Sequence, residues 1–188
     1  VVPRLAAFLA ERYGVEFRRG VAASAVAPPV METSHGPINA ARFAICPGDD
    51  LTTLFPDRIA SYGVHRCKLQ MLRLAHPGHN LKAALVSDLS LLRYGGYAAM
   101  PQAAALKTRL QAERAGALAH GVHLIVVQSA DGSLVVGDSH HYGATPDPFA
   151  EDAVERLILD EFAMILGRVP PVLARWTGTY SSARNEAF

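Results

Sequence analysis

The sequence predicts an α+β protein built mainly from an antiparallel β-sheet with helices beside it. Three observations lead to this prediction. Asp131-Gly132 separates two β-branched runs, and a tight Asp-Gly turn in that setting is typical of a β-hairpin. Apolar residues recur at helical spacing between 147 and 167, which indicates a long amphipathic helix. Half of the 188 residues are hydrophobic, enough for a sizeable core.

The first part of the chain predicts one helix followed by a small β-meander. The helix covers 2–13, has its apolar side chains on one side and ends at Gly14. Pro28-Pro29 interrupts the strands because proline has no amide donor. No capping residue precedes the helix, so we expect the sequence to be part of a longer chain or to lack an upstream half. Four strands are expected, at 15–17, 21–26, 31–34 and 38–45.

The middle of the chain predicts further strands and one helix. Helix formers run through 102–118, with Leu106 and Leu110 four residues apart. The Asp131-Gly132 hairpin follows this helix. Strands are expected at 65–75, 81–87, 89–94, 123–128 and 134–137.

A third helix and a last strand complete the prediction. Asp147 has the side chain of a helix cap, Pro148 suits the first helical position and Gly167 ends the helix. The segment 172–180, after a Pro-Pro pair, predicts one more strand. The expected protein therefore has three helices.

The composition excludes several classes of protein. The 18 basic and 17 acidic side chains nearly balance, and the basic ones are scattered rather than clustered for phosphate binding. No apolar run approaches the ~20 residues of a membrane-spanning helix, and no signal peptide is evident. Cys46 and Cys67 alone cannot form a disulfide framework. We expect a cytoplasmic protein that binds neither nucleic acid nor membranes.

The richest chemistry lies in the six residues 137–142, Gly-Asp-Ser-His-His-Tyr, at the end of a predicted strand. Asp138, His140 and His141 have the side chains of metal ligands, and a histidine there suits acid or base catalysis. The alternative is a capped turn with histidines on a solvated loop. No serine-hydrolase elbow and no nucleotide-binding glycine loop is present.

Two other histidine pairs have spacing that suits zinc. His76 and His79 flank a Pro-Gly turn, and His120 and His123 lie at the entry to a strand. Neither pair has a thiolate or third ligand next to it in the sequence. We therefore expect this spacing to be accidental.

Four short motifs occur in the order found in a known protein family. They are Arg12-Tyr13-Gly14-Val15-Glu16-Phe17, Ala41-Arg42-Phe43-Ala44-Ile45-Cys46-Pro47-Gly48, the hairpin ending in Val136-Gly137, and Arg175-Trp176-Thr177-Gly178. With them the chain resembles, over essentially its whole length, the FAD-dependent oxidoreductases of the D-amino-acid oxidase, glycine oxidase and sarcosine oxidase type. The stretches 68–73, 131–134 and 137–140 look most like the branch associated with phosphonate catabolism.

The resemblance implies a domain order. Residues 1–60 would be an incomplete FAD-binding portion, 61–145 an antiparallel substrate domain, and 146–188 a helix and strand returning toward the FAD domain. The family's N-terminal Rossmann βαβ unit and its final glycine-rich segment have no counterpart in these residues. We expect the missing segment, a partner subunit or a second copy of the chain to cover the apolar surface against which they would pack.

The resemblance also implies where FAD binds. In such enzymes the strand after the first helix passes the adenosine of FAD, and a strand end with small residues lies close to the cofactor. Small residues suit both places because the backbone must approach the ligand closely. The implied cofactor-binding residues are Val21, Ala22, Ala23, Cys46, Pro47 and Gly48.

The implied activity is oxidation of a C–N bond in a small amine, with hydride transfer to FAD. Tyr97, His140 and Tyr180 are the implied substrate contacts, and this interpretation assigns no metal ligand. Tyr180 stands where amino-acid oxidases carry the arginine that grips the substrate carboxylate. Because a phenol is no bidentate cation, another amine is favoured over a plain α-amino acid. A phosphonate-bearing amine needs cationic groups, for which Arg73 and Arg93 are candidates.

Two other classes of function stay open. One is a small-molecule-binding module without catalysis. The other is a metal-dependent hydrolase that uses Asp138, His140 and His141.

Overall fold

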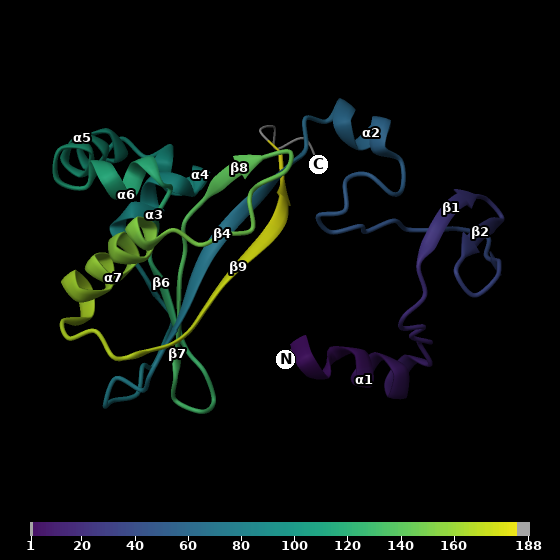
Figure 1. The fold of residues 1–188 in the computed structure, drawn as a ribbon, viewed down its shortest axis with the longest axis horizontal. Helices are drawn as coiled ribbons and strands as arrows, with labels where there is room; N and C mark the ends of the chain where they lie inside the picture. The colour runs from purple at the N-terminus through teal and green to yellow at the C-terminus, as the bar shows by residue number, and fades with distance from the viewer. Residues whose placement is uncertain (1, 184–188) are drawn as a thin grey trace. The chain divides into compact units, whose positions relative to one another are not determined.

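The computed structural model describes residues 2–183 and confirms the predicted α+β class (Figure 1). The chain divides into two compact units, Val1–Ile59 (unit 1) and Ala60–Phe188 (unit 2). Helix α2, Pro56–Ser61, contains the point of division. Both sheets are antiparallel in all their pairings.

Unit 1 has one helix and a three-stranded sheet in the order β1-β2-β3. The predicted helix and meander are confirmed, but the strands are shorter than expected. Only Val30 and Met31 of β2 pair with β3, so β3 ends at Asn39, whereas the predicted strand extends to 45. Residues 15–17 are not a strand. The elements are α1 (Val2–Tyr13), β1 (Ala23–Ala27), β2 (Val30–Thr33) and β3 (Ile38–Asn39).

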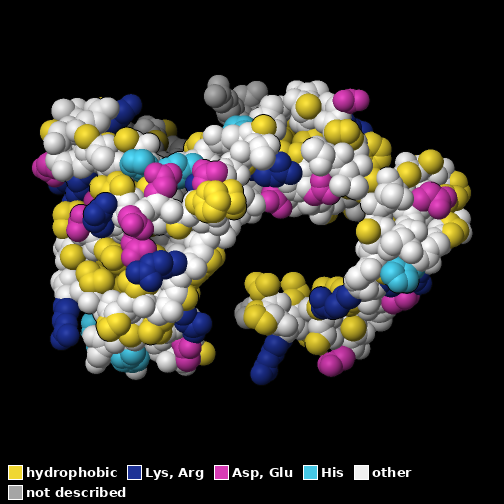
Figure 2. Space-filling model, viewed as in Figure 1, with side chains coloured by type: hydrophobic (Ala, Val, Ile, Leu, Met, Phe, Trp, Pro, Cys, Tyr) yellow, Lys and Arg dark blue, Asp and Glu magenta, His cyan; other side chains and the backbone are white. Residues whose placement is uncertain are grey.

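Helix α1 exposes the apolar face that its sequence predicts. Leu5 is 45% and Phe8 53% exposed, and yellow side chains gather on this helix in Figure 2. The Phe8 ring meets Tyr13 edge-on, 5.9 Å between centroids, which is a contact within the helix. Among the described residues of α1, none is buried.

Unit 2 is organised around β4, which covers 65–74 of the strand predicted at 65–75. The strand order of the sheet is β5-β6-β7-β4-β8. β7 and β8 pair with successive parts of one edge of β4, and β9 pairs with the opposite edge of β4. The Asp131-Gly132 hairpin joins β6 and β7 as expected. The strands are β4 (His65–Leu74), β5 (Leu85–Val86), β6 (Ile125–Gln128), β7 (Leu134–Gly137), β8 (His141–Gly143) and β9 (Val172–Ser182).

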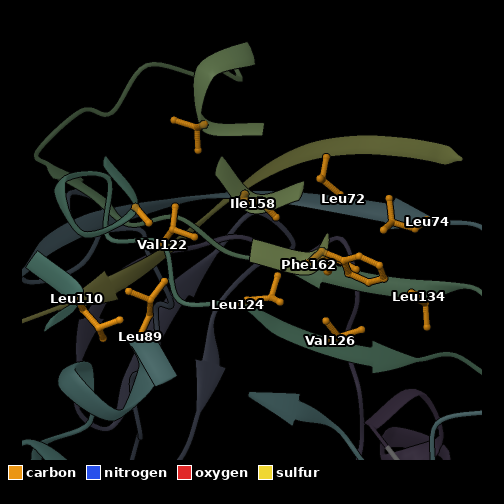
Figure 3. Packing of buried hydrophobic residues seen from close by; sticks show 13 residues of the cluster. Leu72, Leu74, Leu89, Leu110, Val122, Leu124, Val126, Leu134, Ile158 and Phe162 are labelled. Carbon is orange, nitrogen blue, oxygen red and sulfur yellow. The ribbon is translucent and has the colours of Figure 1, made fainter. Parts of the chain in front are cut away.

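The core of unit 2 lies between one face of this sheet and its helices. Leu72 and Leu74 on β4 pack with Leu134 on β7 and with Phe162 on α7, all fully buried (Figure 3). Short helices contribute Leu89 and Leu110 to the same cluster. The helices are α3 (Asp88–Arg93), α4 (Gly95–Ala98), α5 (Ala103–Glu113), α6 (Ala115–Ala119) and α7 (Asp152–Leu166).

The predictions of three helices and of strands at 81–87 and 89–94 are wrong. Only 85–86 pairs as a strand, and 88–93 is helix α3, in which Leu89 enters the core. The predicted helix at 102–118 is interrupted at Arg114, whose φ of −139° separates α5 from α6. The guanidinium there bridges Asp88 and Glu161, each at 2.9 Å.

The last helix begins at Asp152 and not near Asp147. Polar side chains of β4 hold the preceding segment outside the helix. Lys68 Nζ donates to Asp147 Oδ2 at 3.0 Å and to the carbonyl of Phe149 at 3.1 Å. The Gln70 amide makes two hydrogen bonds with the backbone of Glu151, as a neighbouring strand would. Gly167, at φ +76°, ends the helix as predicted.

Within residues 2–183, none of the helices has both the length and the apolar character required to cross a membrane.

Candidate functional site

The candidate site lies on the face of the unit 2 sheet opposite the core. Cys67 of β4 pairs with Tyr142 of β8 and with Tyr180 of β9. Cross-strand partners in an antiparallel sheet point to the same face, so these side chains form a row across three strands. Lys68, the next residue on β4, points to the face that carries the core.

Two histidines stack beside this row. His123 comes two residues before β6, and His140 directly precedes β8. Their rings lie 4.4 Å apart at an angle of 22°, with the two Nε2 atoms 3.2 Å apart. Both side chains are buried. His140 also lies 6.4 Å, ring to ring, from Tyr142 and from Tyr180.

Hydrogen bonds at the other ring nitrogens orient the two imidazoles. His140 Nδ1 donates to the carbonyl oxygen of Gly121 at 2.9 Å, and His123 Nδ1 lies 3.3 Å from the hydroxyl of buried Ser90. Gly121 has a φ of +58°, and a Cβ there would come within 2.9 Å of His140 Cβ. A residue without a side chain at 121 therefore lets its carbonyl reach the imidazole.

The carboxylate of Asp138 lies beside both imidazoles. Its Oδ1 is 3.4 Å from His123 Nε2, and its Oδ2 is 3.9 Å from His140 Nε2. Oδ1 is buried and has no hydrogen-bond partner among the described residues. We call His123, Asp138 and His140 the His-Asp cluster.

Burial controls the ionisation of the His-Asp cluster. It raises the pKa of Asp138 to about 6, although the positive charge of Arg93 opposes this. It lowers the pKa of His123 to about 3 and that of His140 to about 4. At neutral pH the two imidazoles are therefore uncharged and the carboxylate is mostly charged.

Arg93, the last residue of α3, supplies a cation to this site. Its Nη2 donates to the Tyr180 hydroxyl at 3.2 Å, and its guanidinium carbon lies 5.9 Å from the centre of the Tyr142 ring. Burial raises the pKa of Tyr180 to about 12, so the phenol stays protonated. Arg73, the other predicted cation, is instead bound to Asp131 and Ser133 at the hairpin turn.

The structure brings some of the predicted catalytic residues together and separates others. His140 and Tyr180 share the site. His141 pairs with Lys68 and points to the opposite face, because successive strand residues alternate. Of the three residues considered as metal ligands, Asp138 and His140 lie together, whereas His141 lies on the other face and His123 is beside Asp138 instead. Tyr97 lies in α4, is 55% exposed and, among the described residues, joins none of the site's ring contacts.

Four of the six residues expected at the cofactor line one pocket of unit 1. Of the other two, Ala22 donates its N–H to Ser34 Oγ at 3.0 Å, and Gly48, at φ +64°, follows the pocket residue Pro47. Small and apolar side chains dominate the lining, which admits close approach of a ligand to the backbone. The pocket has a volume of about 410 Å³ and is lined by Val21, Ala23, Met31, Ala44, Ile45, Cys46, Pro47, Asp50, Thr53 and Leu54.

His123 and Ser90 are site residues that sequence reasoning missed. The spacing of His123 and His120 indicated no third ligand. The signal lay in the hairpin register: Gln128 pairs with Leu134 and Ile125 with Gly137. Continuing that register brings His123 alongside 138–140 but opposite Ser139, so alternation alone would turn Asp138 and His140 to the other face. The pairing with β4 shifts by one residue between Gly137 and His141, and this shift turns His140 to the face of His123. Ser90 had no such signal, because it lies on a segment predicted as a strand.

The chain is similar in structure to three solved oxidoreductases. The glycine oxidase of Geobacillus kaustophilus matches 95% of this chain with a TM-score of 0.61 and 14% identity. The glycine oxidase of Bacillus cereus ATCC 14579 matches 87% at a TM-score of 0.56 and 13% identity. The L-proline dehydrogenase of P. horikoshii matches 95% at a TM-score of 0.60 and 13% identity.

These matches cover 40%, 37% and 42% of the respective solved chains, so this chain spans about two fifths of their length. No protein-family model and no curated protein matches the sequence. At these identities the likeness shows a shared fold. The chain thus shares the fold of a portion of these oxidoreductases.

Proposed function

We propose that the chain is part of a flavin-dependent oxidoreductase that binds FAD and oxidises the C–N bond of a small anionic amine. The observation that carries the proposal is the Arg93–Tyr180 pair in a fold shared with glycine oxidase and proline dehydrogenase. The family resemblance implies an arginine at the position of Tyr180. Here Arg93 brings a guanidinium to that same side chain from α3.

The pocket of unit 1 fits one end of such a cofactor. Its lining includes Ala23, Ala44 and Pro47, and its volume of about 410 Å³ suits part of a dinucleotide and not the whole. Val21, Ala22, Ala23, Cys46, Pro47 and Gly48 would hold the adenosine end and its surroundings. The rest of the cofactor site would come from segments outside these residues, on the same chain or on a partner.

When bound, FAD would accept the hydride equivalent removed from the substrate. The residues of this chain would bind and orient the amine. Arg93 is partly desolvated and backed by the Tyr142 ring, so it would hold a carboxylate or phosphonate more strongly than an exposed arginine would. Tyr180 and the uncharged His140 would contact the rest of the substrate, and Tyr97 would contact it from α4.

The test is the visible absorption of the purified protein carrying this chain, supplied with FAD, under anaerobic conditions. We expect a bound flavin whose bands bleach when an anionic secondary or phosphonate-bearing amine is added. Bound flavin that no amine bleaches would indicate a binding module without this activity. Failure to bind FAD would overturn the proposal.

Arg93→Gln tests the substrate class. We expect KM for an anionic amine to rise by about tenfold to a hundredfold, because a desolvated charge-assisted contact is lost, while a neutral amine is unaffected. Arg73→Gln is the matched control, since Arg73 is held by Asp131 at the hairpin turn. Equal effects of the two variants would remove Arg93 from the site.

A further inference from the structure

Three potential metal ligands lie close together in the His-Asp cluster. One nitrogen from each imidazole and one carboxylate oxygen lie within 4.8 Å of one another. The separations are 3.2 Å between the Nε2 atoms of His123 and His140 and 3.4 Å from His123 Nε2 to Asp138 Oδ1. His140 Nε2 lies 3.9 Å from Asp138 Oδ2. Ligands about 2.05 Å from a tetrahedral ion are about 3.3 Å from each other, so the cluster nearly has the dimensions of a metal's ligand set.

Hydrogen bonds to the Nδ1 atoms of the two imidazoles leave both Nε2 atoms facing the interior of the cluster. The Gly121 carbonyl can only accept, so His140 Nδ1 carries the proton and Nε2 of the neutral ring carries a lone pair. The Nε2 atoms of His123 and His140 are themselves hydrogen-bonded to each other, so His123 Nε2 carries a proton and donates to His140 Nε2. Ser90 Oγ, 3.3 Å from His123 Nδ1, can donate or accept, so metal binding would move the His123 proton to Nδ1, where Ser90 Oγ accepts it. A partner on the far nitrogen is the arrangement by which proteins fix metal-binding histidines.

Asp138 supplies the second, independent observation. Its Oδ1 is buried, faces His123 and has no hydrogen-bond partner in the described part of the chain. Leaving a buried carboxylate oxygen unpaired is costly. A cation between the three side chains would neutralise this charge and use all three lone pairs.

We propose that His123, Asp138 and His140 form a binding site for one divalent transition-metal ion of the zinc type. Two imidazoles and a carboxylate are ligands that suit zinc and iron(II) and not calcium or magnesium. Three protein ligands leave at least one coordination position open.

Arg93 defines what the open position would take. It contacts the neighbouring Tyr180 and Tyr142, and a second cation beside the ion favours an anionic ligand over a neutral or cationic one. An anionic oxygen ligand, such as hydroxide, carboxylate or phosphonate, would be attracted by both. The metal site lies wholly within unit 2 and does not rest on the proposed flavin chemistry.

The test is titration of chelator-treated, flavin-free protein with Co²⁺ at neutral pH, followed by displacement with Zn²⁺. We expect one Co²⁺ per chain, with the intense visible bands of a four-coordinate site, and bands that disappear when Zn²⁺ is added. Absence of binding to the unmodified protein would overturn the proposal, whatever the flavin experiment shows.

Variants assign the ligands. Asp138→Asn and His140→Gln keep the side-chain size and should weaken Co²⁺ binding at least tenfold. The matched control is the double variant His120→Gln, His141→Gln, which removes the neighbouring pair of rings 5.4 Å apart and should bind as before. Binding lost in the control and kept in Asp138→Asn would overturn the assignment.

A variant that changes no ligand covers the case in which a ligand variant fails to fold. Ser90→Ala removes the partner of His123 Nδ1 and should weaken Co²⁺ binding about tenfold, as loss of an outer-shell partner does. Far-ultraviolet circular dichroism of each variant checks the fold. An unchanged affinity in Ser90→Ala, together with unchanged binding in the folded ligand variants, would place the ion elsewhere.

Discussion

The two units of the chain differ most in what they bury. Of residues 2–59, none is buried, although this region has an amphipathic helix and a paired three-stranded sheet. In unit 2 a single cluster of fully or nearly fully buried side chains joins the sheet to α3, α5, α6 and α7. Local sequence signals suffice to form elements in both units, but only unit 2 encloses a core. We infer that unit 2 carries most of the stability of this chain.

The sharpest test of this comparison is a pair of phenylalanines. Phe162→Ala removes a fully buried ring from the unit 2 core and should cost about 3–5 kcal/mol of the free energy of unfolding. Phe8→Ala, on the exposed face of α1, should change it by no more than about 0.5 kcal/mol. Urea denaturation followed by circular dichroism measures both. Equal effects would show that unit 1 contributes as much as unit 2.

Arg114→Ala should come close to the effect of Phe162→Ala. It leaves Glu161, whose side chain is 3% exposed, without its cation, and unpairing a buried charge costs about 3–5 kcal/mol. Burial already raises the pKa of Glu161, with Arg114 opposing. Arg109→Ala breaks the exposed arm of the same network at Asp88 and should cost at most about 1 kcal/mol. If both variants lowered the urea midpoint by the same amount, burial of Glu161 would not account for the larger cost expected of Arg114→Ala.

Asp138→Asn should make unit 2 more stable in the absence of metal. The pKa of Asp138, raised to about 6, means that the folded state disfavours its charge; at 1.36 kcal/mol per pKa unit, removing the charge at pH 7 should gain about 1–3 kcal/mol. Thermal unfolding with and without Zn²⁺ measures this. Zn²⁺ should stabilise the unmodified protein and not the variant, and a less stable variant without metal would contradict the reasoning.

The smallest effect is a loss of stability on mild acidification. The pKa values of His123 and His140 lie below the value of about 6.5 in the unfolded chain, so the unfolded state binds more protons. Stability from these groups is therefore present above pH 6.5 and is lost as the pH falls toward 4 and 3. Asp138 acts in the opposite sense, since its folded form takes up a proton near pH 6.

Between pH 7 and 6 the net loss should be about 1 kcal/mol. Fluorescence of Trp176 reports it, because this single tryptophan lies on β9 of unit 2. His140→Gln should reduce the dependence on pH. A transition midpoint that is flat from pH 7 to 6 in the unmodified protein would contradict the assignment.

Predictions from the sequence succeeded where a signal is local. The Asp131-Gly132 hairpin, the strand at 65–74 and the end of α7 at Gly167 depend on turn chemistry and alternation within a few residues. They failed where distant partners decide. Gln70 and Lys68 on β4 bind the segment 147–151 through its backbone and Asp147, so the helix expected from Asp147 begins at Asp152.

The candidate site shows the same division. Asp138 and His140 stood out because polar residues crowd a strand end, whereas His123 becomes their neighbour only through the pairing of β6 with β7. Arg93 was one of two candidate cations, and only the fold distinguishes it from Arg73. Contacts between residues far apart in the sequence thus bring both His123 and Arg93 to the site.

Because side chains alternate along His140, His141 and Tyr142, the length of the preceding segment decides which imidazole faces the site. His140 faces the Arg93 side of the sheet, and His141 faces Lys68. Deleting or inserting a single residue between Gly137 and His141 would shift the register by one and exchange the two imidazoles. Point substitutions can tune this site gradually, but length changes in this segment would replace its chemistry in one step, so evolution should tolerate the former far more readily.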